Sequence, residues 1–198
     1  MLIRLGSCAH LDDIFREWEE WAAALLESHI SYPPLGFFRS QHINESWLGA
    51  LTMMLDTTAL VSAGVDGIAK EQAKLTFAIA RHAMVDLAQL VRAQYDPLAP
   101  NRLDDEELAK VRQALMDHGL RSADVTRSND KLTYLRSLYE PYAVAMARNL
   151  LITLPPWIHP EKTKDNWEAG PWDRAIQARS LAGLGHHAER VQKMDEHF

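Results

Sequence analysis

The sequence has only one cysteine, Cys8, and few of the patterns that most functional classes require. A single cysteine excludes an internal disulfide framework and a thiolate zinc site, and it fits a reducing compartment. The two most apolar stretches, 47–63 and 75–91, both carry charged residues, so neither offers the ~20 uninterrupted apolar positions that a membrane span needs. We therefore expect a cytoplasmic chain that does not itself cross a bilayer.

Basic residues are also fewer than acidic residues. The chain has 21 Lys and Arg residues against 27 Asp and Glu residues, a formal net charge of -6. A nucleic-acid partner would require clustered positive charge, so we expect none. Nucleophile elbows, phosphate loops and dinucleotide fingerprints are missing as well, and no catalytic residue can be assigned. These absences favour a non-enzymatic role.

What is present is helical periodicity. With 198 residues, 47% of them hydrophobic, the chain is long enough to bury a substantial core. Apolar residues repeat at spacings of three and four, which predicts an all-α bundle of about five main helices. The predicted helices begin at Leu11, after a cap at Asn44, at 68, after the capping box at 104–107, and at 129. The helix at 68–95 is apolar nearly all round between 75 and 91, so we expect it to be the central one.

Particular residues mark one helix end and one kink. His118-Gly119 should close the fourth helix, because glycine suits the position after a helix end. Pro141 should kink the last helix, 129–154, because proline removes a hydrogen-bond donor. We predict a helical bundle domain at 1–154, and at 155–198 a Trp/Pro-rich arm and polar helical tail packed on that bundle.

Polar side chains lie inside or beside these apolar helices. Burying a charge without a partner is costly, so such residues need an explanation. His82 and Asp86 are one helical turn apart and share a face, and Asp56 lies in the middle of an apolar helix. The candidate cluster for ligand binding or a polar network is Glu27, His29, Arg39, His42, Asp56, His82 and Asp86.

Three interpretations of this cluster stay open. It could bind a divalent metal, with His82, Asp86 and Asp56 as the candidate ligands. It could instead be a hydrogen-bonded network that fixes the register of the helices, or a stripe that faces solvent. Titration with zinc, manganese and iron would distinguish the first interpretation from the other two.

Short runs along the chain carry a family resemblance, among them Leu-Tyr-Glu-Pro-Tyr at 138–142 and Leu-Pro-Pro-Trp at 154–157. The full set is 25–33, 38–42, 46–48, 55–57, 59–60, 75–78, 81–82, 85–87, 138–142, 154–157 and 165–167. In these runs the sequence resembles bacterial potassium-channel-like proteins, which have a two-helix pore followed by a helical cytoplasmic region. Pore helices and a filter loop are lacking here, so this chain cannot conduct ions by itself.

The resemblance implies a role beside a membrane. We expect a regulatory, assembly or sensing domain of a potassium-channel-like protein, tethered at the inner face of the membrane and multimeric like such pores. Its partners would be further copies of itself and a membrane-embedded pore module. Two alternatives remain: a metal-dependent helical enzyme or metal-binding protein that uses the polar cluster, and a stand-alone helical adaptor.

Overall fold

The computed structural model describes residues 10–38, 46–65, 70–96, 99–120 and 124–158. The chain divides into two units, Met1–His159 and Pro160–Phe198, and every described residue belongs to the first. Arg39, His42 and the predicted arm from residue 159 onward therefore lie outside the described residues.

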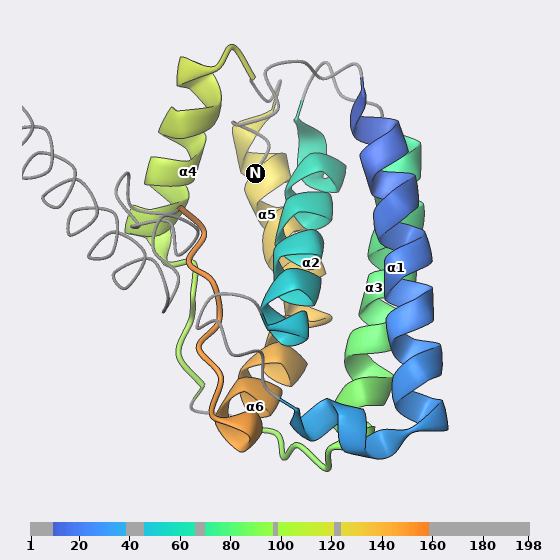
Figure 1. Ribbon diagram of the computed structural model, residues 1–198. Helices are drawn as coiled ribbons and strands as arrows, with labels where there is room; N and C mark the ends of the chain where they lie inside the picture. Colours follow the sequence, from blue (N-terminus) through green and yellow to red (C-terminus); the bar gives the residue numbers. More distant parts are fainter. Residues whose placement is uncertain (1–9, 39–45, 66–69, 97–98, 121–123, 159–198) are drawn as a thin grey trace, which may run out of the picture. The chain divides into compact units, whose positions relative to one another are not determined.

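The described ranges form helices and contain no strand, which confirms the all-α prediction. In Figure 1, α1 and α3 lie side by side and run in the same direction, α2 runs the opposite way beside them, and α5 packs behind α2. The elements are α1 (Leu11–Ser31), the short 3-10 helix η3 (Pro33–Phe37), α2 (Trp47–Gly64), α3 (Lys70–Leu90), α4 (Asp105–Asp117), α5 (Val125–Ser137) and α6 (Glu140–Leu150).

Helix ends follow local chemistry. The Asp104 side chain accepts a hydrogen bond from the Glu107 backbone N–H at 2.8 Å, which confirms the predicted cap of α4. His118 ends that helix, and Gly119 follows with a φ of +74°, a conformation in which glycine has no Cβ penalty. Asn44, the predicted cap of α2, lies outside the described residues. Ser46 caps α2 by accepting from the Gly49 N–H at 2.9 Å.

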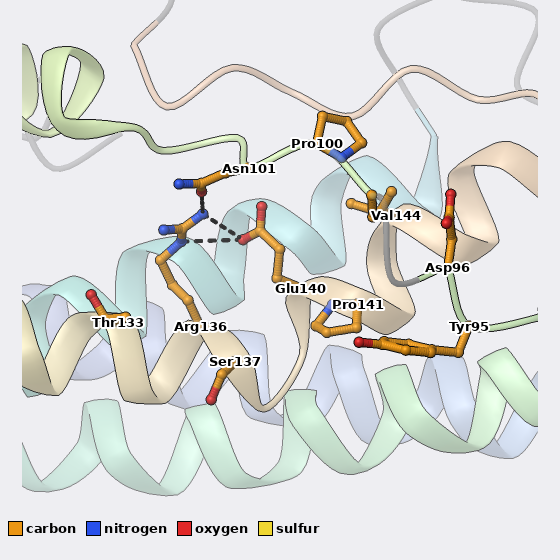
Figure 2. Close-up of a pocket in the computed structure, with 11 residues that line it drawn as sticks. Tyr95, Asp96, Pro100, Asn101, Thr133, Arg136, Ser137, Glu140, Pro141 and Val144 are labelled. Carbon is orange, nitrogen blue, oxygen red and sulfur yellow. Dashed lines mark hydrogen bonds and ion pairs between the residues drawn. The ribbon is translucent and has the colours of Figure 1, made fainter.

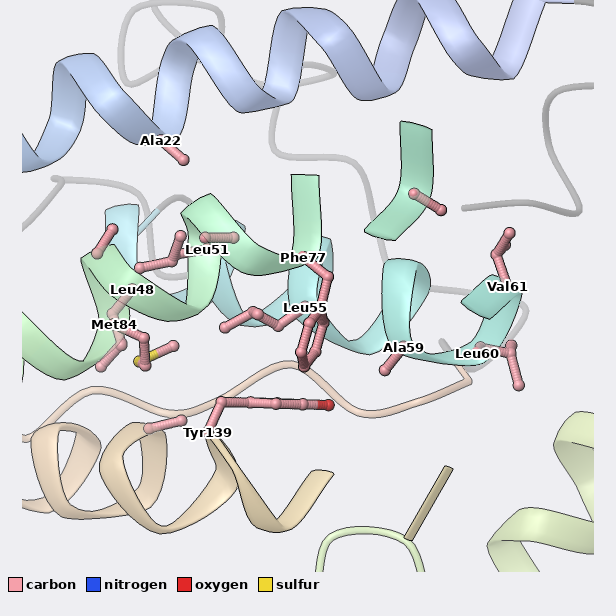
Figure 3. Packing of buried hydrophobic residues seen from close by; sticks show 14 of the residues in the cluster. Ala22, Leu48, Leu51, Leu55, Ala59, Leu60, Val61, Phe77, Met84 and Tyr139 are labelled. Carbon is pink, nitrogen blue, oxygen red and sulfur yellow. The ribbon is translucent and has the colours of Figure 1, made fainter. Parts of the chain in front are cut away.

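The central helix is α2, and the prediction that 68–95 would be central is wrong. Thirteen of the 18 residues of α2 are buried, whereas Leu75 and Ile79 of α3 are 56% and 37% exposed. Figure 3 shows the core around Leu55, which is fully buried. Because α2 is covered on nearly all sides, any charged residue on it must find a partner within the protein.

Several hydroxyl groups on α2 are buried. Thr52 donates to the Leu48 carbonyl and Thr58 donates to the Met54 carbonyl, both at 2.7 Å. Each hydroxyl is thus satisfied within its own helix, one turn back. Polar residues of this kind can be buried at little cost, so they do not mark a solvent-facing side.

The predicted last helix, 129–154, is two helices. A proline ring clashes with the carbonyl four residues before it, which for Pro141 is the carbonyl of Ser137, and α5 ends at Ser137. Pro141 then lies in the first turn of α6, where a missing N–H leaves no intrahelical bond unmade. Tyr139, in the break, is fully buried, and its ring meets the edge of Phe77 at 6.0 Å between centroids. The proline therefore produces a break rather than a kink.

Within the described ranges, we find no helix that combines the length and the apolar character needed to span a membrane.

Candidate functional site

A cluster of buried charges lies where α2, the segment before α4, and the α5–α6 break meet. Its hub is the guanidinium of Arg102, whose Nη2 donates to both carboxylate oxygens of Asp56, at 2.7 and 2.8 Å. The exposed fractions of the two side chains are 12% and 9%. We call the set Asp56, Asn101, Arg102, Arg136, Tyr139 and Glu140 the central ion network.

The other two nitrogens of Arg102 contact further parts of the chain. Its Nε donates to Glu140 Oε1 at 3.0 Å, and its Nη1 donates to the Pro155 carbonyl at 3.2 Å. One guanidinium therefore joins α2, α6 and the segment 151–158 that follows α6. Arginine suits this role because its planar head carries donors in several fixed directions.

A second arginine completes the network. Glu140 uses its other oxygen, Oε2, to accept from Arg136 Nε at 3.2 Å, so one carboxylate bridges two guanidinium groups. Arg136 also donates to Asn101 Oδ1 at 2.7 Å and to the Leu103 carbonyl at 3.3 Å. With Asp56 and Glu140 ionised, two positive and two negative charges balance.

Asp56 is the network member with the most unusual protonation equilibrium. Burial raises its pKa from 3.8 to about 6, although Arg102 and a hydrogen bond from Tyr139 act in the opposite direction. The Tyr139 hydroxyl donates to Asp56 Oδ1 at 2.6 Å. Burial and the nearby carboxylate hold the pKa of Tyr139 well above its ordinary value, so the phenol stays protonated.

Arg102 keeps its charge in the same surroundings. Burial disfavours the charged guanidinium, but Asp56 and Glu140 together hold the pKa of Arg102 above its ordinary value. The positive end of the network is therefore fixed, and Asp56 is the member that can gain or lose a proton near neutral pH.

The segment 151–158 lies against this network. The guanidinium of Arg136 lies 5.6 Å from the ring centroid of Trp157, within cation–π distance, and Arg102 holds the neighbouring Pro155 carbonyl. Trp157 and Leu154 also pack on the hydrophobic core. Trp157 belongs to the predicted tryptophan arm, but the packing of that arm on the bundle stays a prediction, because Trp167 and Trp172 lie outside the described residues.

One side of the network forms the wall of a pocket of about 300 Å³. Figure 2 shows Arg136, Glu140 and Asn101 on this wall, with Tyr95 and Ser137 among the other lining residues. Tyr95 and Ser137 are exposed, so solvent reaches this pocket. Glu140 contacts both the pocket and Arg102, which brings water within one residue of the buried Asp56–Arg102 pair.

The described members of the predicted cluster do not converge around Asp56. His82 Nε2 and Asp86 Oδ2 do pair, at 3.2 Å, but their side chains are 69% and 36% exposed on α3. Glu27 is exposed on α1. His29 is buried, with Nδ1 hydrogen-bonded to the Leu25 carbonyl at 2.8 Å.

In the part of the chain that the structure describes, no group of three or more His, Cys, Asp or Glu side chains is placed to hold a metal ion. The hydrogen-bonded interpretation fits Asp56, and the solvent-facing interpretation fits the His82–Asp86 pair. Arg39 and His42 lie outside the described residues, so their part in a metal site stays a prediction.

Five of the six members of the network were not among the predicted site residues. Arg102 lies between a proline-rich breaker and a helix cap, a position typical of a solvent-exposed loop, and nothing local links it to Asp56. The available signal was Asp56 itself, because a carboxylate in an apolar helix requires a cationic partner. The five residues are Asn101, Arg102, Arg136, Tyr139 and Glu140.

Comparison of the chain with protein-family models, curated proteins and solved structures finds no match.

Proposed function

We propose that this chain is a non-enzymatic helical domain that regulates, assembles or senses for a potassium-channel-like membrane protein. Support comes from where the resembling runs fall in the fold. Asp56 belongs to the run 55–57, Tyr139 and Glu140 to 138–142, and Trp157 to 154–157. The runs that carry the resemblance thus contribute the two acidic residues of the central ion network, its tyrosine, and the tryptophan that lies beside it.

The pairing of charges in the central ion network favours a structural or signalling role over catalysis. Asp56 contacts Arg102 and Tyr139, and Glu140 contacts Arg102 and Arg136. Each buried charge is therefore paired with another protein group. Such a network holds helices in one arrangement, whereas a catalytic base or nucleophile must reach a substrate. This pairing is the single observation that carries the non-enzymatic part of the proposal.

Cell fractionation tests the link to a membrane. An antibody raised against this chain would be used on membrane and soluble fractions of the source cells, with and without detergent. We expect the antigen in the membrane fraction and released only by detergent. A band of 22.5 kDa, the mass of this chain, found only in the soluble fraction would contradict the proposal.

Self-association provides a second test, because pores of this kind are multimeric. Size-exclusion chromatography with light scattering, over a hundredfold range of concentration, should show a mass that rises above 22.5 kDa. A strict monomer at the highest concentration would count against an assembly role. In that case, the metal-binding alternative would be tested by titration of zinc into the chain and into its His82→Ala variant.

A further inference from the structure

We propose that the Asp56 carboxylate is a proton-binding site, and that its protonation tightens the hold of the central ion network on segment 151–158. This proton-dependent contact goes beyond the proposed function, because it would operate in this chain whether or not a pore is attached.

The geometry couples Asp56 to the segment through one side chain. Arg102 donates to Asp56 from Nη2 and to the Pro155 carbonyl from Nη1. If segment 151–158 moves away, Arg102 loses that acceptor and water gains access to its guanidinium. Hydration of Arg102 then reaches the carboxylate bonded to it at 2.7 Å. Asp56 is therefore dehydrated when the segment is held and hydrated when it is released.

The groups that face Asp56 come from several elements. Arg102 faces it from the segment before α4, and Tyr139 and Glu140 face it from the α5–α6 break. Arg136 of α5 lies behind Glu140, and α3 contributes the uncharged Phe77 against the Tyr139 ring. The segment 151–158 contributes only a backbone carbonyl at this point, from Pro155.

The direction of the effect follows from proton linkage. The held state has an Asp56 pKa of about 6, whereas a hydrated carboxyl returns toward 3.8. The held state therefore binds the proton more tightly, so acid favours the held state and a rise in pH through about 6 favours release. The two pKa values differ by about two units, so the released-to-held ratio can rise by up to about 100-fold.

A route for the proton is present. The pocket that Figure 2 shows brings solvent to Glu140, which is hydrogen-bonded to Arg102. A proton can therefore reach the edge of the network without unfolding of the helices. The resulting equilibrium would respond to pH between about 4 and about 6.

Hydrogen exchange measured by mass spectrometry tests the proposal on the full chain. Protection factors, corrected for the intrinsic pH dependence of exchange, would be measured from pH 5 to pH 8. Most of the linkage lies below pH 6, so between pH 5 and pH 8 we expect protection of peptides from 151–158 to fall by about 10-fold relative to peptides from α1. No relative change would overturn the proposal.

Variants separate the role of Asp56 from that of the other ionisable groups of the chain, among them nine histidines. Asp56→Asn should give a flat profile at 151–158, while Asp86→Asn, a change at a half-exposed acid on α3, should keep the wild-type profile. The same slope in Asp56→Asn as in the wild type would refute the role of Asp56, as would loss of the slope in Asp86→Asn.

A third variant tests the proposal if Asp56→Asn does not fold. Tyr139→Phe removes a hydrogen bond that lowers the Asp56 pKa and leaves the ring that packs against Phe77. The midpoint of the protection profile should therefore move to higher pH. A midpoint that stays in place or moves to lower pH would contradict the proposal.

Discussion

Replacement of Arg102 by methionine should destabilise the fold by more than any exposed arginine change could. Methionine keeps much of the side-chain volume but removes the charge that faces Asp56 and Glu140. Loss of one partner of a buried ion pair costs about 3 to 5 kcal/mol, because the remaining charge stays buried without compensation. The Pro155 carbonyl loses its donor in the same step. We expect Arg102→Met to lower the free energy of unfolding by about 3 to 5 kcal/mol at pH 7.5.

The loss of unfolding free energy in Arg102→Met should increase as the pH rises. Without Arg102, the largest influence that lowers the Asp56 pKa is gone, so the pKa rises further above about 6. The folded variant then binds a proton at pH values where the folded wild type does not, and each such pH unit is worth about 1.4 kcal/mol. Between pH 6 and pH 7.5 the difference amounts to about 2 kcal/mol. Arg102→Met should therefore be less harmful at pH 5 than at pH 7.5.

The assay is urea unfolding followed by far-UV circular dichroism at both pH values, with the m-value compared between variants. Arg16→Met is the matched control, because Arg16 and its partner Asp13 are 59% and 66% exposed and such pairs contribute less than about 1 kcal/mol. The double variant Asp56→Asn/Arg102→Met should regain at least about 1 kcal/mol over Arg102→Met, because no unpaired charge remains at position 56. The reasoning fails if Arg102→Met loses no more than Arg16→Met, or loses the same at pH 5 and pH 7.5.

Three further outcomes can be checked by the same unfolding assay. Leu55→Ala on α2 should cost about 2 to 5 kcal/mol, whereas Leu75→Ala on α3, which is 56% exposed, should cost less than about 1 kcal/mol; the reverse order would restore α3 as the central helix. Ser46→Ala removes the cap of α2 and should cost about 1 kcal/mol, and an unchanged midpoint would argue that the cap is dispensable. Lys131→Met removes a cation that donates to the Ser62 carbonyl near the C-terminal end of α2. We expect the free energy of unfolding to fall by about 0.5 to 1 kcal/mol, and by less in high salt. A loss that does not depend on salt would exclude the charge effect.

Local patterns in the sequence predicted the local features of this fold. Asp104 was identified as a cap because its carboxylate and the first turn it serves are adjacent in the chain. The choice of central helix failed because the apolar side chains of α3 at Leu75 and Ile79 face solvent, while threonines such as Thr58 on α2 bond their own helix and are buried. Side-chain type alone does not distinguish these cases.

The candidate site was predictable only in part, for a related reason. A carboxylate in the middle of an apolar helix shows that Asp56 needs a partner. The identity of that partner depends on how the helices pack, because Arg102 lies 46 residues further along the chain. The exposed His82–Asp86 pair had the stronger local pattern, since its members are one turn apart, yet it lies on the surface of α3.

The long sequence separations within the central ion network have a consequence for folding kinetics. Arg102 is 46 residues from Asp56 and 53 from Pro155, and Tyr139 is 83 residues from Asp56. Several large loops must close before these contacts can form, and a partly assembled network would hold unpaired charges in an apolar environment. The contacts should therefore form after the main folding barrier. Substitutions in the network should accelerate unfolding while leaving the rate of folding almost unchanged, so the network governs how long a folded molecule persists rather than how quickly it forms.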